Sequence, residues 1–95
     1  MKVLSDEGGG ITEESLEYFS KHFIDIGRVF RITCSSDDRI YNTELEGEKG
    51  IMLLSGFSCG YSGTGPRGLY KLLILLGWVG NFQDIAGTHL FETRI

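Results

Sequence analysis

The residues best suited to chemistry lie between Gly56 and Gly77, in the segment GFSCGYSGTGPRGLYKLLILLG. An apolar run leads into this segment, glycines recur through its middle, and the only proline of the chain, Pro66, opens an apolar helical pattern. This order predicts a strand, a glycine-rich loop and a helix N-terminus. The unpaired N–H groups and the dipole at a helix N-terminus both favour a negatively charged group. The segment therefore predicts an anion-binding site.

A small phosphorylated or nucleotide-like ligand would use four kinds of group here. Backbone N–H groups would surround the phosphate, two hydroxyls would add hydrogen bonds, and Tyr61 would offer a flat surface for a base. Arg67 and Lys71 are four residues apart, so both cations lie on one helix face. The predicted ligand-binding residues are Tyr61, Ser62, Gly63, Thr64, Gly65, Arg67, Gly68 and Lys71. The alternative is a tight strand-to-helix turn whose glycines only permit close packing.

Two known nucleotide motifs overlap the loop, but neither fits. The spacing Gly63-x-Gly65-x-x-Gly68 matches the dinucleotide-binding fingerprint, yet too little chain follows the helix to build the parallel sheet of that fold. The spacing Gly60-x-x-x-x-Gly65 matches the start of a P-loop, but Pro-Arg follows where that motif needs Lys and Ser or Thr. We therefore reject both families and keep only the physical features that they share with this loop.

The run FSCGYSGTGPRGL at residues 57–69 resembles the signature of small bacterial and phage domains of unknown function. Those domains carry F-x-W-G-Y-G-G-S-G-P-x-x-L between a strand and a helix. Here Cys59 replaces the tryptophan and Ser62 replaces a glycine. The resemblance implies a small α+β domain of the kind found on mobile elements, and it transfers no activity.

Other candidate chemistry is sparse. Neither His22 nor His89 has a cysteine or carboxylate at metal-ligand spacing, so we expect no metal site and no cofactor. Cys59 is either a nucleophile activated by the neighbouring helix dipole or, by preference, a buried and inert thiol. No pair of carboxylates stands on an apolar background that would separate two pKa values. We expect a protein without catalytic activity.

Composition narrows the partners and the compartment. The chain has 95 residues and a net charge of −4, which argues against binding a nucleic-acid polymer through a broad basic surface. The longest apolar run falls far short of the roughly 20 residues of a membrane span, and no signal peptide is recognisable. We therefore expect a cytoplasmic protein whose two cysteines stay reduced.

The pattern predicts one α+β domain over residues 1–95, with a mainly antiparallel sheet of three to five short strands and two packed helices. Residues 1–10 are expected to be a flexible leader, in which Val3 and Leu4 would add an edge strand. Thr12 is the expected N-cap of the first helix. The expected helices are 13–26 and 66–76, the expected strands are 28–34, 39–46, 51–57 and 89–95, and 78–88 is expected to be a loop.

Two functions of different classes follow. The first is a non-catalytic binder of a small phosphorylated or nucleotide-like ligand, for example a phage protein that sequesters a nucleotide signal. The second is a protein-binding module, such as a small inhibitor of a host defence enzyme, which would use the acidic side chains of Glu44, Glu46 and Glu48 while the glycine loop is structural. The second helix is apolar almost all round, so either protein would form a homodimer or a higher homo-oligomer.

Overall fold

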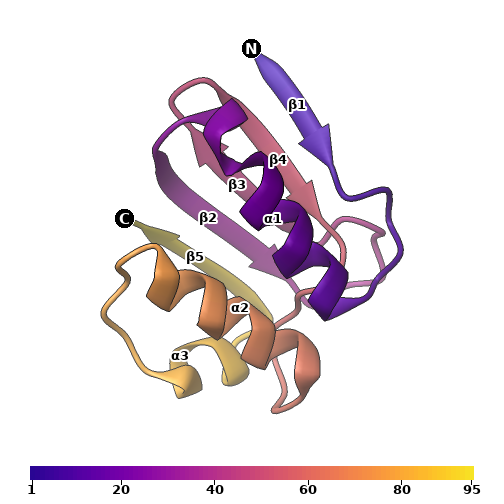
Figure 1. The fold of residues 1–95 in the computed structure, drawn as a ribbon. Coiled ribbons are helices and arrows are strands. Elements are labelled where there is room, and N and C mark those ends of the chain that lie inside the picture. The colour runs from indigo at the N-terminus through magenta and orange to yellow at the C-terminus, as the bar shows by residue number, and fades with distance from the viewer.

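The computed structural model describes all residues from Met1 to Ile95, and it confirms the α+β class. A five-stranded sheet, mostly antiparallel, carries two main helices on one of its faces (Figure 1). In chain order the elements are β1 (Lys2–Ser5), α1 (Thr12–Ile26), β2 (Val29–Ser35), β3 (Thr43–Gly47), β4 (Gly50–Leu54), α2 (Thr64–Leu75), α3 (Phe82–Ala86) and β5 (Leu90–Arg94).

The strands follow one another in space in the order β1-β4-β3-β2-β5. The central three form the antiparallel meander that the two short connections predict. β5 adds to β2 in the antiparallel sense, and β1 adds to β4 as the only parallel neighbour. Val3 and Leu4 thus form the edge strand that the sequence suggests.

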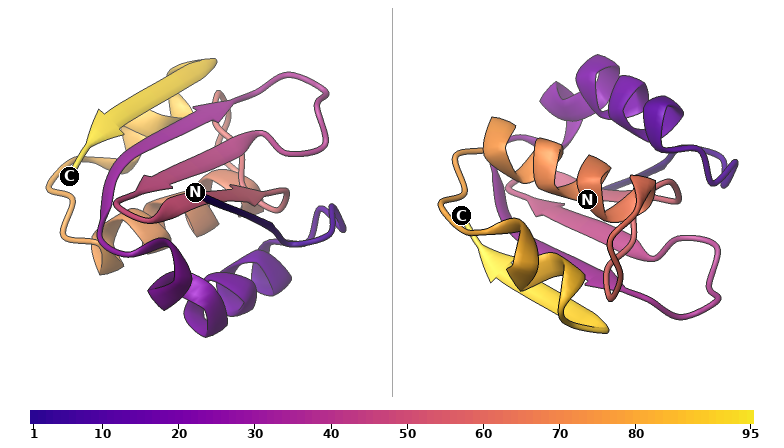
Figure 2. Two further views of the ribbon diagram at one scale, coloured as in Figure 1. Left: turned by 90° about the horizontal axis from the view of Figure 1, so that it is seen from above. Right: turned by 90° about the horizontal axis from the view of Figure 1, so that it is seen from below.

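The core lies between the helices and one face of the sheet. Ile32, Leu45 and Met52 are neighbours across β2, β3 and β4, and all three are fully buried. Leu69 and Leu72 of α2 are fully buried as well, which agrees with the expected deep position of this helix. Figure 2 shows that no helix covers the other face of the sheet, where the alternate residues of the same strands point.

Both main helices exist, but their first turns differ from the prediction. α2 begins at Thr64, two residues before Pro66, so the proline is the third helical residue. It is tolerated there because the first four N–H groups of a helix have no intrahelical acceptor. The residue before α1 is Ile11 rather than Thr12, and the Thr12 hydroxyl instead donates to the Gly56 carbonyl over 2.6 Å. A long-range contact therefore replaces the expected N-cap.

Residues 78–88 were expected to be a loop, and that prediction is wrong for the five residues of α3. The Asp84 carboxylate accepts the N–H of Asn81 at the start of this helix over 3.0 Å. Phe82 packs edge-on against Tyr70 of α2, with the ring centroids 5.8 Å apart. Tertiary packing of an aromatic side chain thus stabilises a helix too short to form alone.

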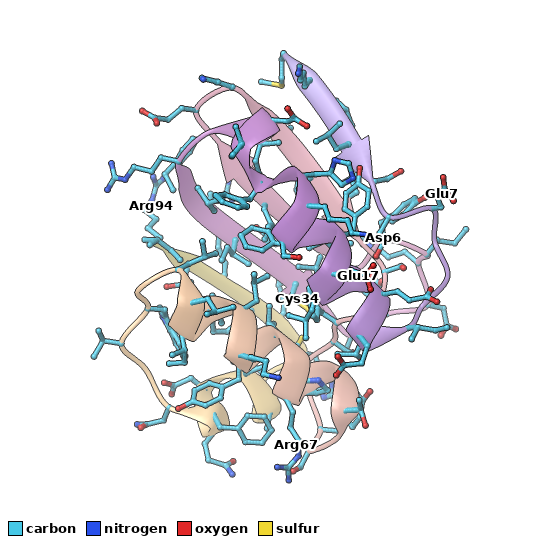
Figure 3. All side chains as sticks on the ribbon, viewed as in Figure 1. Asp6, Glu7, Glu17, Cys34, Arg67 and Arg94 are labelled. Atoms are coloured by element: carbon cyan, nitrogen blue, oxygen red, sulfur yellow. The ribbon has the colours of Figure 1, made fainter.

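A cluster of hydrogen bonds around Asp6 joins the N-terminal segment to α1 and β4. The carboxylate accepts the hydroxyl of Ser15, the N–H and the hydroxyl of Ser55 (2.9 Å each), and the N–H of Gly8 (3.2 Å). The Ser15 hydroxyl oxygen in turn accepts the Gly56 N–H over 2.8 Å. Figure 3 shows Asp6 beside the N-terminal half of α1. We name these three side chains, Asp6, Ser15 and Ser55, the Asp6 cluster.

Hydrogen bonding controls the ionisation of this carboxyl. Burial by itself raises the pKa of Asp6, but the hydrogen bonds from Ser15, Ser55 and Gly8 outweigh burial and lower the pKa below its usual value. A carboxyl whose pKa is lower in the folded chain stabilises the fold above its unfolded pKa of about 3.9, and this contribution is lost as the pH falls through the folded pKa.

We predict that Asp6→Ala lowers the free energy of unfolding at pH 7 by about 2–4 kcal/mol, because it leaves buried donors without an acceptor. The difference from wild type should shrink in acid, as the wild-type carboxyl becomes protonated. Thermal or denaturant unfolding across pH 2–7 measures both effects. Glu7→Ala, at the exposed neighbouring carboxylate, is the control and should change stability by no more than about 0.5 kcal/mol. Equal losses for the two variants would contradict a specific role for Asp6.

Candidate functional site

A polar hollow of about 520 Å³ opens at the N-terminal end of α2. Three separate parts of the chain form its wall: the turn before α1, the end of the β2–β3 connection, and the segment from the end of β4 to the first turn of α2. We call it the α2 hollow. Its lining residues are Gly10, Ile11, Thr12, Asn42, Ser55, Gly56, Phe57, Ser58, Tyr61, Thr64 and Gly65.

The N-terminus of α2 is uncapped at this hollow. Gly63, the residue before the helix, has no side chain with which to accept an N–H group, and the first turn contains no acidic residue. The N–H groups of Thr64 and Gly65 donate to no other group of the chain. The N–H of Arg67 is not free, because it donates to the Gly63 carbonyl over 3.0 Å. Among the predicted site residues that line the hollow, Thr64 and Gly65 thus have backbone N–H groups free to bind an anion, whereas the N–H of Arg67 is engaged in the helix.

Tyr61 lies across the first turn of α2. A Cβ atom added to Gly63 would lie 2.5 Å from the tyrosine ring, and one added to Gly65 would lie 3.3 Å from its hydroxyl oxygen. Tyr61 is 52% exposed and lines the hollow. Tyr61, Thr64 and Gly65 are therefore brought together as predicted, while Ser62 and Gly63 lie outside the lining.

The two predicted cations lie elsewhere. Arg67, Gly68 and Lys71 line a smaller groove of about 200 Å³ between α1 and α2, together with Glu13. The Arg67 guanidinium is 5.5 Å from the ring centroid of Phe82, a cation–π distance, and Figure 3 shows this side chain at the periphery. The groove and the α2 hollow share Thr12 and Thr64, so they adjoin, but no positive side chain lines the hollow itself.

Two of the loop glycines have clear packing roles. Gly60 has φ +86°, a left-handed conformation that favours glycine. At Gly68 a Cβ atom would lie 2.2 Å from Cγ2 of Thr12 and 3.1 Å from the ring of Phe57. The start of α2 therefore lies directly against the start of α1, and only glycine permits this contact. The interpretation of the loop as a close-packed turn thus holds for Gly60 and Gly68.

Asn42 and Ser58 line the hollow but were not among the predicted site residues. Asn42 lies in the β2–β3 connection, more than ten positions before the glycine loop in the sequence, and nothing in its local pattern signals a site. Ser58 lies inside the loop. The only signal in the sequence that could have marked it as a site residue is its hydroxyl group close to the glycines. Both residues reach the site because the fold brings the β2–β3 connection and the segment after β4 next to the start of α2.

Neither cysteine is a reactive thiol. Both are free and fully buried, and burial raises the pKa of Cys34 to about 12. Burial raises the pKa of Cys59 as well, which disfavours a thiolate there. The Thr43 hydroxyl donates to the Cys34 sulfur over 3.3 Å. These buried positions agree with the expectation that the thiols are inert.

The uncovered face of the sheet carries a network of charges. Arg31 bridges two carboxylates, with its Nη1 3.1 Å from Glu46 and its Nη2 2.9 Å from Glu92. Glu44 forms no salt bridge of its own. Burial, followed by the charge of Glu46, raises its pKa above the usual value, and the charge of Arg31 offsets this only in part. Arg31, Glu44 and Glu46 line a depression of about 260 Å³ on this face, with Leu53 and Leu90 beside them.

No protein-family model, curated protein or solved structure matches this chain. The resemblance of residues 57–69 to small phage and bacterial domains therefore remains a prediction from that motif. None of the helices is both long and apolar enough to cross a bilayer. No cluster of three or more histidine, cysteine or carboxylate side chains is placed to hold a metal ion.

We predict that Gly68→Ala destabilises the fold, although alanine is favoured over glycine inside a helix by about 1 kcal/mol. The added methyl group meets Thr12, and overpacking of this kind costs about 1–3 kcal/mol. Thr12→Ser removes the opposing methyl group and keeps the hydroxyl that binds Gly56. The double variant should therefore recover most of the loss, as measured by denaturant unfolding of all four proteins. Additive effects would show that the two residues are not in contact.

Proposed function

We propose that the protein binds a small phosphorylated or nucleotide-like ligand in the α2 hollow, without catalysing its conversion. The observation that carries the proposal is the pair of free N–H groups at Thr64 and Gly65, which open into a hollow at an uncapped helix N-terminus. Helix N-termini of this kind bind phosphates in many proteins, because the donors and the dipole act together. The volume of the hollow falls within the range of about 300–1,000 Å³ that is typical of small-molecule sites.

Each lining group has a role in this proposal. The phosphate oxygens accept the two free N–H groups and the Thr64 hydroxyl, and the Asn42 amide binds a sugar or base edge. The Tyr61 ring stacks on a base. Arg67, one turn further along α2, adds positive potential from the adjoining groove rather than a direct contact. The ligand is thus oriented by neutral donors.

The absence of a nucleophile or a separated acid and base pair suits a protein that holds its ligand unchanged. Sequestration of a nucleotide signal by a protein of a phage or mobile element is the biological setting that we propose for it. Such a role needs only affinity and a sufficient amount of protein. It agrees with the motif resemblance at residues 57–69, and it requires that the α2 hollow bind the ligand.

A thermal-shift screen tests the proposal with inorganic phosphate, nucleoside phosphates, cyclic and linear dinucleotides, and NAD-derived compounds. A ligand at 100 times its Kd adds about 2.7 kcal/mol to the stability of the folded chain. For a domain of this length that raises Tm by roughly ten degrees or more. We expect at least one phosphorylated compound to do so.

The matched variants are Thr64→Asp and Thr64→Asn. A carboxylate in the first turn interacts favourably with the helix dipole by about 0.3–1 kcal/mol, so Thr64→Asp should be at least as stable as wild type, yet it should repel the anion. Thr64→Asn is similar in size and neutral and should keep most of the ligand-induced shift. Equal shifts in both variants would place the ligand elsewhere, and no shift with any compound would exclude these ligand classes.

A protein-binding module is the second candidate, and the uncovered face of the sheet favours it. Glu44 is partly buried there without a salt bridge of its own, beside Glu46 and apolar Leu53, and the charge of Arg31 offsets its raised pKa only in part. A lysine or arginine of a partner protein would pair with these carboxylates and lay its aliphatic part on the leucine. An inhibitor of a host enzyme with a basic surface is the partner that this face would fit.

We predict that Glu44→Gln raises Tm at pH 7. A carboxyl whose pKa is raised by folding destabilises the fold once it ionises, so the variant removes that penalty. The advantage should vanish below about pH 4, where the wild-type side chain is protonated. Glu48→Gln, at the exposed turn between β3 and β4, is the control and should leave Tm unchanged. An unchanged or lower Tm for Glu44→Gln at pH 7 would remove the electrostatic basis for a cationic partner.

A further inference from the structure

The groove between α1 and α2 continues into an apolar surface that no part of the chain covers. Beyond the charged end described above, it widens to about 680 Å³. The apolar side chains that line it are Leu16, Phe19, Phe23, Leu75 and Leu76. Ile24 and Ile74 lie on the outer sides of the same two helices, 72% and 48% exposed. We call Phe23, Ile24, Ile74 and Leu75 the apolar patch.

The apolar patch lies at the C-terminal ends of the two helices. Phe23 shares the apolar face predicted for α1, yet it remains 45% exposed, and Leu75 of α2 is 71% exposed. Isolated exposed apolar residues are normal, but several side by side mark an interaction surface. The patch therefore indicates that something binds to this face.

The N-terminal ends of the same helices carry opposite charges. Glu13 and Glu17 are exposed on α1, where Glu17 already pairs with Lys21 over 2.7 Å, and Arg67 and Lys71 are exposed on α2. The two helices run side by side in the same direction, so these charges lie before the apolar patch along the groove, and Lys71 borders the patch one turn before Leu75 (Figure 1).

We propose that this face is the interface of a symmetric dimer, in which a second copy of the chain covers the groove. A two-fold axis that runs along the groove places α1 of one copy over α2 of the other, with the same chain direction. Glu13 and Glu17 then face the partner's Arg67 and the partner's Lys71, and the reciprocal pairs form by symmetry. Ile24 meets the partner's Leu75 at the other end.

We choose a second copy over an unrelated partner because one two-fold rotation pairs opposite charges at one end of the groove and apolar side chains at the other. A two-fold axis perpendicular to the helices would instead place the acidic end of α1 against the apolar end of the partner's α1, where its charges would be desolvated without a counter-ion. The proposal does not depend on the ligand site, because the dimer contacts lie in the groove and the apolar patch, while the ligand would bind in the α2 hollow, which adjoins the groove at Thr12 and Thr64.

Light scattering coupled to size-exclusion chromatography tests the dimer directly. We expect the wild-type chain to elute as a dimer at tens of micromolar. Leu75→Lys should elute as a monomer, since it puts charge in the apolar patch without disturbing the core. Leu90→Lys is the matched control: Leu90 is 64% exposed on the opposite face of the sheet, and its variant should stay dimeric.

A charge-exchange pair tests the orientation of the two copies. A basic chain carries Glu13→Lys and Glu17→Lys, and an acidic chain carries Arg67→Glu and Lys71→Glu. In the proposed dimer each of these chains repels its own copy, so each should be monomeric alone. Mixed in equal amounts, they should form a heterodimer, detected by native mass spectrometry.

A monomeric wild-type chain at these concentrations would overturn the proposal. If Leu90→Lys dissociates the dimer while Leu75→Lys does not, the interface lies on the sheet face, and the proposal fails. Charge-altered chains that remain homodimers would exclude the parallel arrangement of α1 over α2. Circular dichroism of each variant confirms that the comparison is made between folded chains.

Discussion

The Asp6 carboxylate is the interaction on which the shape of this molecule depends most. Asp6 directly follows β1, and its carboxylate accepts hydrogen bonds from the β1–α1 connection, from the first turn of α1 and from the residue after β4. The same cluster fixes Gly10 through the Ser55 hydroxyl, which accepts the Gly10 N–H over 2.9 Å. Gly10 and Ser55 both line the α2 hollow. An acidic side chain near the N-terminus, far from the glycine loop in sequence, thus holds one wall of the candidate site.

The one-sided packing of the sheet is the second feature with consequences for function. Both main helices lie on one face, so the chain builds a single core and leaves two large surfaces to water (Figure 2). The sheet face is polar and charged, with Arg31 between two carboxylates. The helical face is apolar at one end and charged at the other. A small protein with two such different faces is suited to binding more than one molecule at once, and the α2 hollow opens beside both.

Much of the fold was predictable because it follows from local patterns. Alternating residues in β2 and β3 and the short turns between strands predict the meander. The helical spacing of Leu16, Phe19, Phe23 and Ile26 predicts α1, although Phe23 stays 45% exposed. The failures arise where distant contacts decide the local structure. Thr12 binds Gly56 instead of capping α1, and α3 depends on packing between Phe82 and Tyr70. These contacts join residues that are far apart in the sequence, so no local pattern predicts them.

The candidate site was predictable to a similar extent. Glycine and proline placement located the start of α2 to within two residues, and Tyr61, Thr64 and Gly65 do lie together. The direction of Arg67 was not predictable, because it depends on the position of Phe82 in a helix that the sequence did not reveal. Asn42 reaches the hollow only through the topology of the sheet. The roles of single glycines also needed the structure, since Gly68 contacts α1 while Gly63 lies against the ring of Tyr61.

The most direct test of the central claim is a titration of the ¹⁵N-labelled protein with inorganic phosphate and with adenosine monophosphate, followed by two-dimensional NMR. If an anion binds at the uncapped start of α2, the largest and saturable shifts belong to the amides of Thr64 and Gly65, with smaller changes at Tyr61 and Asn42. If the shifts instead cluster around Arg31 on the sheet face, or if Thr64 and Gly65 do not move at any concentration, the α2 hollow is not an anion site.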